Sequence, residues 1–327
     1  MPLDTELEVA LRAVAVAAKI CQSVQSRITR ESIEKKDRSP VTIADFASQA
    51  AICKLLGDAF PNDEIVGEEE ADALKSPDNQ RHMADLRAEL ARVAIDATDD
   101  DVCRWIDRGT GKGGSGRFWT LDPIDGTKGF LRGEQYAVSL ALIINGRIEL
   151  GVLGCPNLPC SDAWDRESGV LMSAIRGDGT QLRPLSNITI PPQAVRTSPT
   201  SRADMARVCE SVESGHSAQD VSVQIAQKLG ITAPPVRMDS QAKYATVARG
   251  ESDIYLRLPT RADYREKIWD HAGGVICVEE AGGTVTDVDG LPLDFSQGRE
   301  LRNNRGVIVT NGQLHPAVLA AVKSVLG

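Results

Sequence analysis

The chain has 327 residues, of which 42% are hydrophobic and 25% charged, and it carries a formal net charge of −9. At about 100–200 residues per domain this length predicts two domains, and no stretch approaches the ~18 consecutive apolar residues of a transmembrane helix, so we expect no membrane partner. The acidic surplus argues against a nucleic-acid polymer as the main partner, because a phosphate backbone normally requires a basic patch.

The N-terminal part of the chain predicts two helices. Apolar residues recur at helical spacing over residues 1–28, and a second such pattern covers residues 42–60. The first segment lacks the basic start and the cleavage site of a signal peptide, and the seven cysteines are scattered without a C-x-x-C pair. These features favour a reducing, cytoplasmic location and leave an organelle address open.

The next part of the chain is polar. Residues 69–80 are typical of an exposed connection, and residues 81–106 predict one surface helix. The glycine-rich stretch 107–118 is similar to a phosphate-binding loop, but Lys112 precedes a glycine where a Walker A motif needs Ser or Thr. A flexible loop is therefore the preferred interpretation of this stretch.

A series of strands follows. Apolar and β-branched runs are separated by short turn signals, among them Asn145-Gly146, which predicts a meander of neighbouring antiparallel strands. The runs cover residues 118–121, 136–144, 147–154 and 169–175.

The second half of the chain has a different pattern. A stretch rich in Pro, Ser and Thr, residues 185–204, predicts a domain boundary, which we place between residues 1–190 and 191–327. Beyond it short strands alternate with helices up to the C-terminus, which indicates a sheet covered by helices. The fold class predicted for the whole chain is α/β, with alternating layers of helix and sheet.

Two aspartates in "DPIDGT" provide the first chemical signal. Asp122 and Asp125 are three residues apart, and buried carboxylates at this spacing need cations or protons. Magnesium prefers hard oxygen ligands, which these two side chains and the carbonyl of Ile124 would supply from one segment. The alternative is an ordinary Asp-Gly turn at the surface.

Three other segments add carboxylates near the ends of elements. Glu68 and Glu69 follow a short apolar strand in "EIVGEEE", and Asp270 follows a tryptophan in "KIWDHAGG". Asp45 lies in the first turns of the second predicted helix. Each has a simpler interpretation, a solvated loop for the glutamates and a helix cap for Asp270, but together the set is distinctive. The amides after Asp125, in Gly-Thr-Lys-Gly, could also bind a phosphate.

In that order, "PVTIAD", "VGEE", "DPIDGT" and "WDHAGG" resemble the magnesium-dependent, lithium-sensitive phosphatases of the inositol monophosphatase superfamily. Further stretches, "DPIDGTKGFLRGEQYAVSLALI", "GCPNLP", "ESGHS", "DSQAKY", "DIYLRLP" and "EKIWDHAGG", are most similar to the 3'(2'),5'-bisphosphate nucleotidases within it. The resemblance runs from about Ser39 to the C-terminus and is weakest in the polar part. It implies the sugar-phosphatase fold of that superfamily.

The resemblance also implies a role for each matching residue. Glu68, Asp122 and the Ile124 carbonyl would hold one magnesium, and Asp122, Asp125 and Asp270 a second, in a site for two or three ions that lithium inhibits. Thr127, hydrogen-bonded to Asp45, would activate a water molecule that Glu69 orients. The implied substrate-binding residues are Gly126, Thr127, His216, Ser240, Lys243, Arg257 and Asp270.

The chemistry of some of these residues can be weighed on its own. Lys243 and Arg257 suit a phosphate dianion, but without the resemblance a solvated helix residue and a sheet-edge residue are the simpler interpretations. Magnesium disfavours imidazole, so we expect His271 to pack behind the site or support it rather than bind metal. Gly273 stands where the family commonly has alanine and is expected to weaken its helix by up to ~1 kcal/mol.

The implied reaction is the hydrolysis of adenosine 3',5'-bisphosphate to AMP and phosphate by a monomeric enzyme, with 3'-phosphoadenosine 5'-phosphosulfate as a further substrate. An alternative enzyme would act on inositol 1,4-bisphosphate or an inositol monophosphate. A third alternative is a non-catalytic sensor of nucleotide or metal, which would not need the pair of Asp45 and Thr127.

Overall fold

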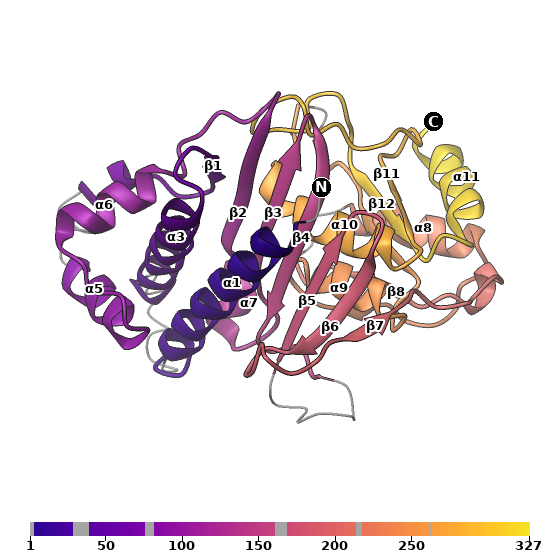
Figure 1. Ribbon diagram of the computed structural model, residues 1–327. Coiled ribbons are helices and arrows are strands. Elements are labelled where there is room, and N and C mark those ends of the chain that lie inside the picture. Colours follow the sequence, from indigo (N-terminus) through magenta and orange to yellow (C-terminus); the bar gives the residue numbers. More distant parts are fainter. Residues whose placement is uncertain (1–2, 29–38, 76–81, 161–168, 214–217, 262) are drawn as a thin grey trace.

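The computed structural model describes residues 3–28, 39–75, 82–160, 169–213, 218–261 and 263–327. These residues form alternating layers of helix and sheet, with helices on both outer sides and a helical layer between two sheets (Figure 1). The predicted layered α/β class is confirmed.

The first outer layer contains the two predicted N-terminal helices. Helix α1 (Asp4–Gln25) packs along α3 (Ser39–Ala59), and α1 contacts strands of the first sheet. The buried face of α1 includes Ala10, Val14, Ala17 and Cys21, whose spacing of three and four is the period that predicted the helix. Helix α3 begins three residues before its predicted start.

The predicted single helix over residues 81–106 is wrong. After a 3-10 helix, η1 (Ala71–Lys75), the chain forms two helices, α5 (Met83–Arg92) and α6 (Asp99–Asp107). Thr98 starts α6: its side chain accepts a hydrogen bond from the Asp101 N–H, 3.2 Å away, and the Asp101 carboxylate accepts one from the Thr98 N–H at 3.0 Å. This capping box satisfies amides that a continuous helix would have bonded internally.

The first sheet has seven strands in sequence order, and the predicted meander is confirmed. β1 pairs with β2 in parallel, and all later neighbours are antiparallel. Asn145 and Gly146, both in the left-handed region at φ 52° and 76°, make the tight turn between β3 and β4. The strands are β1 (Glu64–Gly67), β2 (Arg117–Asp125), β3 (Ala137–Ile144), β4 (Arg147–Cys155), β5 (Val170–Ile175), β6 (Gly179–Pro184) and β7 (Gln193–Val195).

The second half of the chain forms the inner helices, the second sheet and the other outer layer, as its alternating pattern predicted. The second sheet has the order β11-β12-β10-β8-β9 and contains β8 (Val208–Glu210), β9 (Val236–Arg237), β10 (Ile254–Arg257), β11 (Thr284–Thr286) and β12 (Val307–Thr310). The helices are α7 (Thr127–Arg132), which belongs to the first half, η3 (Ala203–Met205), α8 (Gln219–Lys228), α9 (Ala242–Ala248), η5 (Ile268–Asp270), α10 (Ala272–Glu280) and α11 (His315–Leu326).

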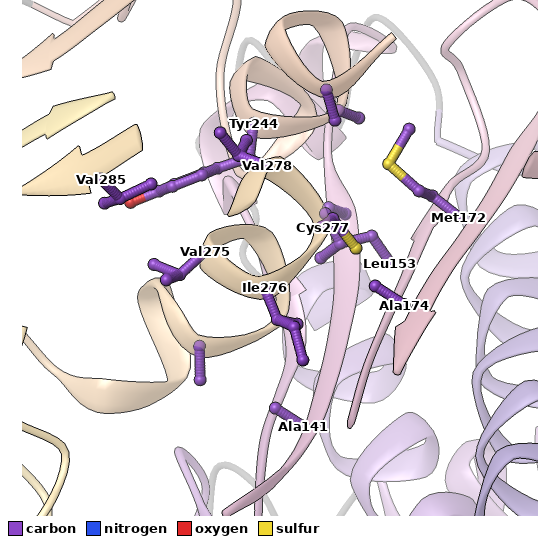
Figure 2. Close-up of a cluster of buried hydrophobic side chains, with 14 of the residues drawn as sticks. Ala141, Leu153, Met172, Ala174, Tyr244, Val275, Ile276, Cys277, Val278 and Val285 are labelled. Atoms are coloured by element: carbon purple, nitrogen blue, oxygen red, sulfur yellow. The ribbon is translucent and has the colours of Figure 1, made fainter. Parts of the chain in front are cut away.

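Helix α10 lies at the centre of the molecule. Its residues Ile276 and Cys277 pack with Leu153 and Met172 of the first sheet, while Val275 and Val278 lie near Tyr244 of α9 and Val285 of β11 (Figure 2). This cluster joins the two sheets through one buried helix. The site described below lies at the N-terminal end of that helix.

Gly273 has a packing role that the sequence did not reveal. A Cβ at this position would lie 2.5 Å from the Ser139 Oγ of β3, and Ser139 donates a hydrogen bond to Gln241 at 3.2 Å. The expected weakening of α10 by glycine is therefore only part of the account. The missing side chain also lets the helix lie close to the sheet.

Two further observations concern the whole chain. Strand β7 pairs with β6, so the first sheet extends past residue 190, and the division into domains at that residue stays a prediction.

Within the ranges that the structure describes, no helix combines the length and the apolar character that crossing a membrane would require.

Candidate active site

The "DPIDGT" segment is the end of a buried strand rather than a surface turn. Asp122 is only 2% exposed, and β2 continues through Asp125. Its pairing with β3 shifts between these two aspartates, a bulge that changes the direction of the side chains. Gly126 follows with φ 88°, and a Cβ there would lie 2.9 Å from the Cβ of Ser240. The alternative of a simple exposed Asp-Gly turn is therefore wrong.

A cavity of about 260 Å³ lies beside this strand end, where the first sheet meets α9 and β10. It brings together residues that are up to about two hundred positions apart in the sequence. The predicted site residues on its wall are Glu68, Asp122, Ile124, Asp125, Gly126, Thr127, Ser240, Lys243, Arg257 and Asp270. Asp45 and Glu69 are not part of the wall, and His216 lies outside the described residues.

The carboxylates of the cavity raise one another's pKa values. Burial raises the pKa of Asp122 well above its ordinary value, and the charges of Glu68, Asp125 and Asp270 raise it further. Burial also raises the pKa of Asp270, with Arg257 acting in the opposite direction. These carboxylates can therefore lie close together only if a bound cation or bound protons offset their negative charges.

The four candidate metal-binding carboxylates lie around the cavity, and their oxygen atoms do not meet at one position. In the described parts of the chain, no three of Glu68, Asp122, Asp125 and Asp270 bring oxygens within 4.8 Å of one another. Burial raises the pKa of Glu68, and a hydrogen bond with Asp122 partly offsets this. The donor set of carboxylates and one carbonyl is that of a hard divalent cation such as magnesium.

A tighter group of possible ligands lies deeper, formed by Glu266, Asp270 and His271. The guanidinium of Arg257 already supplies the positive charge there. Its Nε lies 2.7 Å from Glu266 Oε2, and its Nη2 lies 3.4 Å from Asp270 Oδ2. We therefore interpret this group as an ion-pair cluster and not as the metal site.

Asp45 stands behind the cavity on α3. It is 5% exposed, and its Oδ1 has no hydrogen-bond partner in the described residues. Burial raises its pKa well above the ordinary value, and Glu69 and Glu68 add to the shift. Among the described residues no hydrogen bond between Asp45 and Thr127 is observed. The pairing that the resemblance implies therefore stays a prediction. An unsatisfied buried carboxylate oxygen fits a site that is completed by a bound group.

The glutamate segment is held by one side chain of α3. Gln49 accepts a hydrogen bond from the Glu69 N–H at 3.0 Å and donates one to the Glu69 carbonyl at 2.6 Å. Burial and the charges of Glu68 and Glu70 raise the pKa of Glu69 to about 7. Glu69 is therefore poised to exchange a proton near neutral pH.

Two cations form the opposite part of the wall. Lys243 is 2% exposed, so it is not a solvated helix residue, and its Nζ donates a hydrogen bond to the Met238 carbonyl at 3.2 Å and lies 5.1 Å from the centre of the Tyr255 ring. In the part of the chain that the structure describes, no carboxylate lies within 4.0 Å of it, and burial lowers its pKa to about 8. Arg257 ends β10, an inner strand of the second sheet, so it is not a sheet-edge residue.

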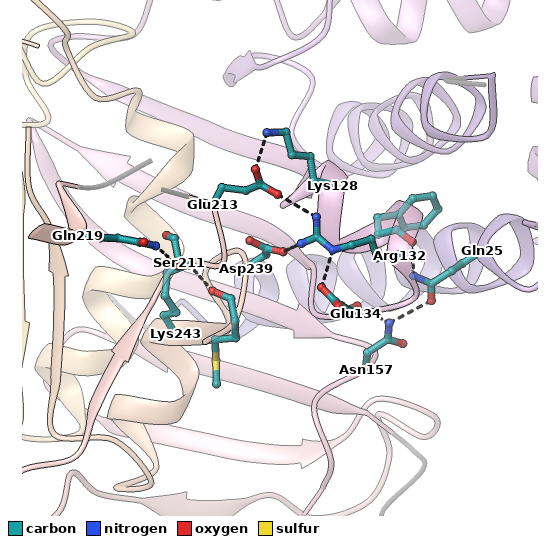
Figure 3. A network of polar contacts seen from close by, with 12 residues as sticks. Gln25, Lys128, Arg132, Glu134, Asn157, Ser211, Glu213, Gln219, Asp239 and Lys243 are labelled. Atoms are coloured by element: carbon teal, nitrogen blue, oxygen red, sulfur yellow. Dashed lines mark hydrogen bonds and ion pairs between the residues drawn. The ribbon is translucent and has the colours of Figure 1, made fainter. Parts of the chain in front are cut away.

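A network of ion pairs includes two lining residues of the cavity, Lys128 and Asp239 (Figure 3). Lys128 and Arg132 of α7 both reach Glu213, at 2.8 and 2.9 Å. Arg132 also pairs with Asp239, which lines the cavity. The network connects α7, which follows β2, to the second half of the chain.

Sequence reasoning missed several cavity residues. Gln241, Tyr244, Tyr255 and Tyr264 line the wall, and Glu266 holds Arg257. Most of these residues lie in or beside the segments "DSQAKY", "DIYLRLP" and "EKIWDHAGG", which also contain predicted site residues. This closeness in sequence could have indicated that they belong to the cavity. His271 is fully buried and hydrogen-bonded to Tyr244 and Glu266, and the expectation that it packs behind the site or supports it stays a prediction.

Comparison with known proteins adds independent information. A sequence profile described as the inositol monophosphatase family matches residues 3–326. The chain is 45% identical over 341 residues to a 3'(2'),5'-bisphosphate nucleotidase of Schizosaccharomyces pombe, covering 99% of this chain and 97% of the relative. It is also 45% identical over 350 residues to a protein of the same name from Emericella nidulans, covering 100% of this chain and 99% of the relative.

Solved structures show the same fold at lower identity. An inositol monophosphatase from Anabaena (Nostoc) sp. PCC 7120 superposes with a TM-score of 0.62 at 22% identity, covering 98% of this chain and 96% of that one. An inositol monophosphatase from Thermotoga maritima gives a TM-score of 0.65 at 20% identity, covering 98% of both chains. At this identity the likeness supports the fold alone.

Proposed function

The chain belongs to the inositol monophosphatase family, and on that premise we propose that it is a magnesium-dependent phosphatase that hydrolyses the 3'-phosphate of adenosine 3',5'-bisphosphate to AMP and phosphate. The names of its full-length relatives support this substrate. We also propose 3'-phosphoadenosine 5'-phosphosulfate as a further substrate, because it carries the same 3'-phosphate.

The observation that carries this proposal is the opposition of charges across one cavity. Carboxylates from β2 and η5 line one part of the wall, and the buried ammonium of Lys243 lines another without a carboxylate partner in the described residues. A substrate with two phosphates satisfies both parts, one at the metal ions and one at the cation. An inositol monophosphate would leave Lys243 uncompensated.

The carboxylates fit magnesium, on which the family generally depends. Glu68, Asp122 and the Ile124 carbonyl would hold one ion, with a second held by Asp122, Asp125 and Asp270. Bound magnesium supplies positive charge that acidifies water and neutralises phosphoryl oxygens.

The side chains around the ions have separate tasks. Asp45 Oδ1, buried and without a partner in the described residues, would accept a hydrogen bond from Thr127. The Thr127 hydroxyl would then orient the attacking water, take its proton and pass its own proton to the Asp45 carboxylate. Glu69, with its pKa near 7, would hold this water from the other side. No covalent bond to the enzyme is needed.

The rest of the substrate would lie against the second half of the chain. Ser240, Lys243 and Arg257, together with His216, would hold the nucleoside and the phosphate that is not cleaved. Gly126 lacks a Cβ, which keeps the Ser240 segment close to the phosphoryl end of the cavity. By resemblance to the nucleotidases, we propose that the enzyme acts as a monomer.

The test is phosphate release from adenosine 3',5'-bisphosphate, inositol 1,4-bisphosphate and inositol monophosphate, each with magnesium and with or without lithium. We expect a preference for the nucleotide and inhibition by lithium. Preference for an inositol phosphate would establish the alternative enzyme. Tight binding of the nucleotide without turnover would indicate a sensor.

A further inference from the structure

A buried chain of polar contacts runs behind the cavity and connects Arg257 to Tyr244, the residue next to Lys243. The Tyr244 hydroxyl lies 2.7 Å from His271 Nδ1, and His271 Nε2 lies 3.1 Å from Glu266 Oε2. The same carboxylate oxygen lies 2.7 Å from Arg257 Nε. Tyr244 is 1% exposed, His271 0% and Glu266 6%, so solvent does not compete for these contacts.

The direction of each hydrogen bond follows from the chemistry of the partners. Arg257 holds the pKa of Glu266 down to about 2 despite burial, so this carboxylate is ionised and can only accept. His271 Nε2 must therefore donate to it. The other ring nitrogen, Nδ1, lies 2.7 Å from the Tyr244 hydroxyl, which can donate a hydrogen bond to it.

The chain of contacts fixes Arg257 from behind and leaves its front available. Glu266 forms an ion pair with the guanidinium, 2.7 Å from Nε, while Asp270 and the Tyr264 hydroxyl each lie 3.4 Å from Nη2. In the described residues Nη1 has no protein partner. Arg257 also lines the cavity, so its guanidinium is held by other groups while one edge remains for an anion.

The other end of the chain of contacts holds helix α9. Tyr244 follows Lys243 directly, and a Cβ at Gly274 would lie 2.4 Å from the Tyr244 ring, so α9 and α10 touch at this point. The Tyr244 ring also meets the Tyr255 ring edge-on at 5.3 Å, and Tyr255 carries the Lys243 ammonium above its face. The position of Lys243 therefore depends on how Tyr244 is held.

We propose that His271 is a positioning residue that sets the spacing between Arg257 and Lys243, and that this spacing gives the enzyme its preference for a bisphosphate over a monophosphate. The inference rests on the proposed function. Neither His271 nor Glu266 touches the reacting phosphate. They act through the two cations that bind the phosphate that is not cleaved.

The cost of the arrangement supports a role in function. A buried ion pair such as Arg257 with Glu266 is often no more stable than an apolar pair of the same size. His271 adds a buried hydrogen bond to Glu266, and Tyr244 adds a second one to His271. Such a network orients groups well, and stability alone does not require it.

The test compares two substrates that differ only in the second phosphate, adenosine 3',5'-bisphosphate and adenosine 3'-monophosphate. For wild type we expect a higher kcat/KM with the bisphosphate. In His271→Phe, which loses two buried hydrogen bonds, this preference should fall about thirtyfold, and in Tyr244→Phe, which loses one, about fivefold, as expected at about 1 kcal/mol for each bond. The monophosphate value should change much less.

Tyr136→Phe is the matched control, since it also deletes a buried tyrosine hydroxyl, but one that has no hydrogen-bond partner in the described residues. It should leave the preference of wild type unchanged. Because Tyr244→Phe removes only one oxygen, it keeps the test valid if His271→Phe does not fold.

A second measurement does not depend on catalysis. The affinity for AMP relative to adenosine reports the contact with the remaining phosphate, and this ratio should fall in Tyr244→Phe but not in Tyr136→Phe. The inference would be overturned if kcat/KM fell equally for both substrates, or if the preference for the bisphosphate were unchanged in both His271→Phe and Tyr244→Phe. Either result would leave the proposed function standing. A wild-type enzyme without any preference for the bisphosphate would instead refute the proposed function, and the inference with it.

Discussion

Two buried aspartates, Asp122 and Asp253, show how the same side chain serves different ends in this molecule. They are 2% and 0% exposed. Asp253 accepts hydrogen bonds from the Arg207 N–H at 2.7 Å, from Arg207 Nε at 3.1 Å and from the Ser198 hydroxyl. Burial would raise its pKa, but the bonds from Arg207 and Ser198 outweigh burial and lower it.

Asp122 has the opposite surroundings. Its one hydrogen bond from the backbone comes from the Ile124 N–H at 3.0 Å, and its other close neighbours are carboxylates, which with burial raise its pKa. A carboxylate whose partners are built into the chain stabilises the fold. One whose neighbours repel it needs a proton or an external cation, so the difference between the two points to the candidate site.

The sharpest way to separate the two aspartates is Asp122→Asn. We expect kcat to fall about 10³-fold or more, since the amide binds magnesium poorly. Without metal, the free energy of unfolding should stay the same or rise by about 1 kcal/mol, because a repelling charge is removed. Phosphate release and urea unfolding in chelator measure the two effects. Magnesium should raise the Tm of wild type but not of the variant; retained activity would disprove the metal assignment.

Asp253→Ala should give the reverse result. The substitution leaves Ser198 and the Arg207 N–H without their acceptor, so we expect the free energy of unfolding to fall by about 3 kcal/mol. The kcat of the folded variant should equal that of wild type at a temperature where the fold persists. Urea unfolding followed by assay of the same preparation measures both. A loss of kcat without a loss of stability would contradict the contrast between the two aspartates.

The sequence predicted most of the fold because most elements have a local pattern. The helical period of residues 1–28 and the alternation after residue 204 became α1 and the second half of the molecule. The failure over residues 81–106 arose because the apolar period continues across a capping box, which a pattern of hydrophobicity does not register.

The carboxylates of the site were visible in the sequence because each lies in a short local motif. Of the residues behind them, His271 was expected to pack there or give support, but Glu266 and Tyr244 were not predicted, since their contacts with His271 join separate elements. The same holds for Gly273, whose role depends on how close α10 lies to β3. The types of residue in the motifs were enough to predict a cluster of carboxylates. Which polar side chains form hydrogen bonds or ion pairs depends on tertiary packing, which the motifs do not contain.

Lys243 offers a test of the cationic part of the cavity through pH. Its pKa is lowered by burial to about 8, so kcat/KM for the bisphosphate should fall by up to about tenfold as the pH rises through 8. The unfolded chain, with a pKa near 10.5, binds more protons between these values, so stability should rise with pH over that window. Lys243→Met should abolish the inflection in kcat/KM and stabilise the protein below pH 8.

The result that would count against this interpretation is an inflection that persists in Lys243→Met. The interpretation would also be contradicted if Lys243→Met raised the free energy of unfolding equally at pH 7 and pH 10. Burying the charged ammonium of Lys243 would then not destabilise the fold. Urea unfolding at the two pH values measures this directly.

Arg207→Met tests the smallest part of the contrast, the contribution of charge to the Asp253 site. The guanidinium is about half exposed, with 48% of its side chain accessible, so solvent weakens the ion pair. The Arg207 N–H and Ser198 still hold the carboxylate in the variant. We therefore expect a loss of only about 1 kcal/mol in the free energy of unfolding, clearly less than for Asp253→Ala. Equal losses in the two variants would show that charge, and not hydrogen bonding, distinguishes Asp253 from Asp122.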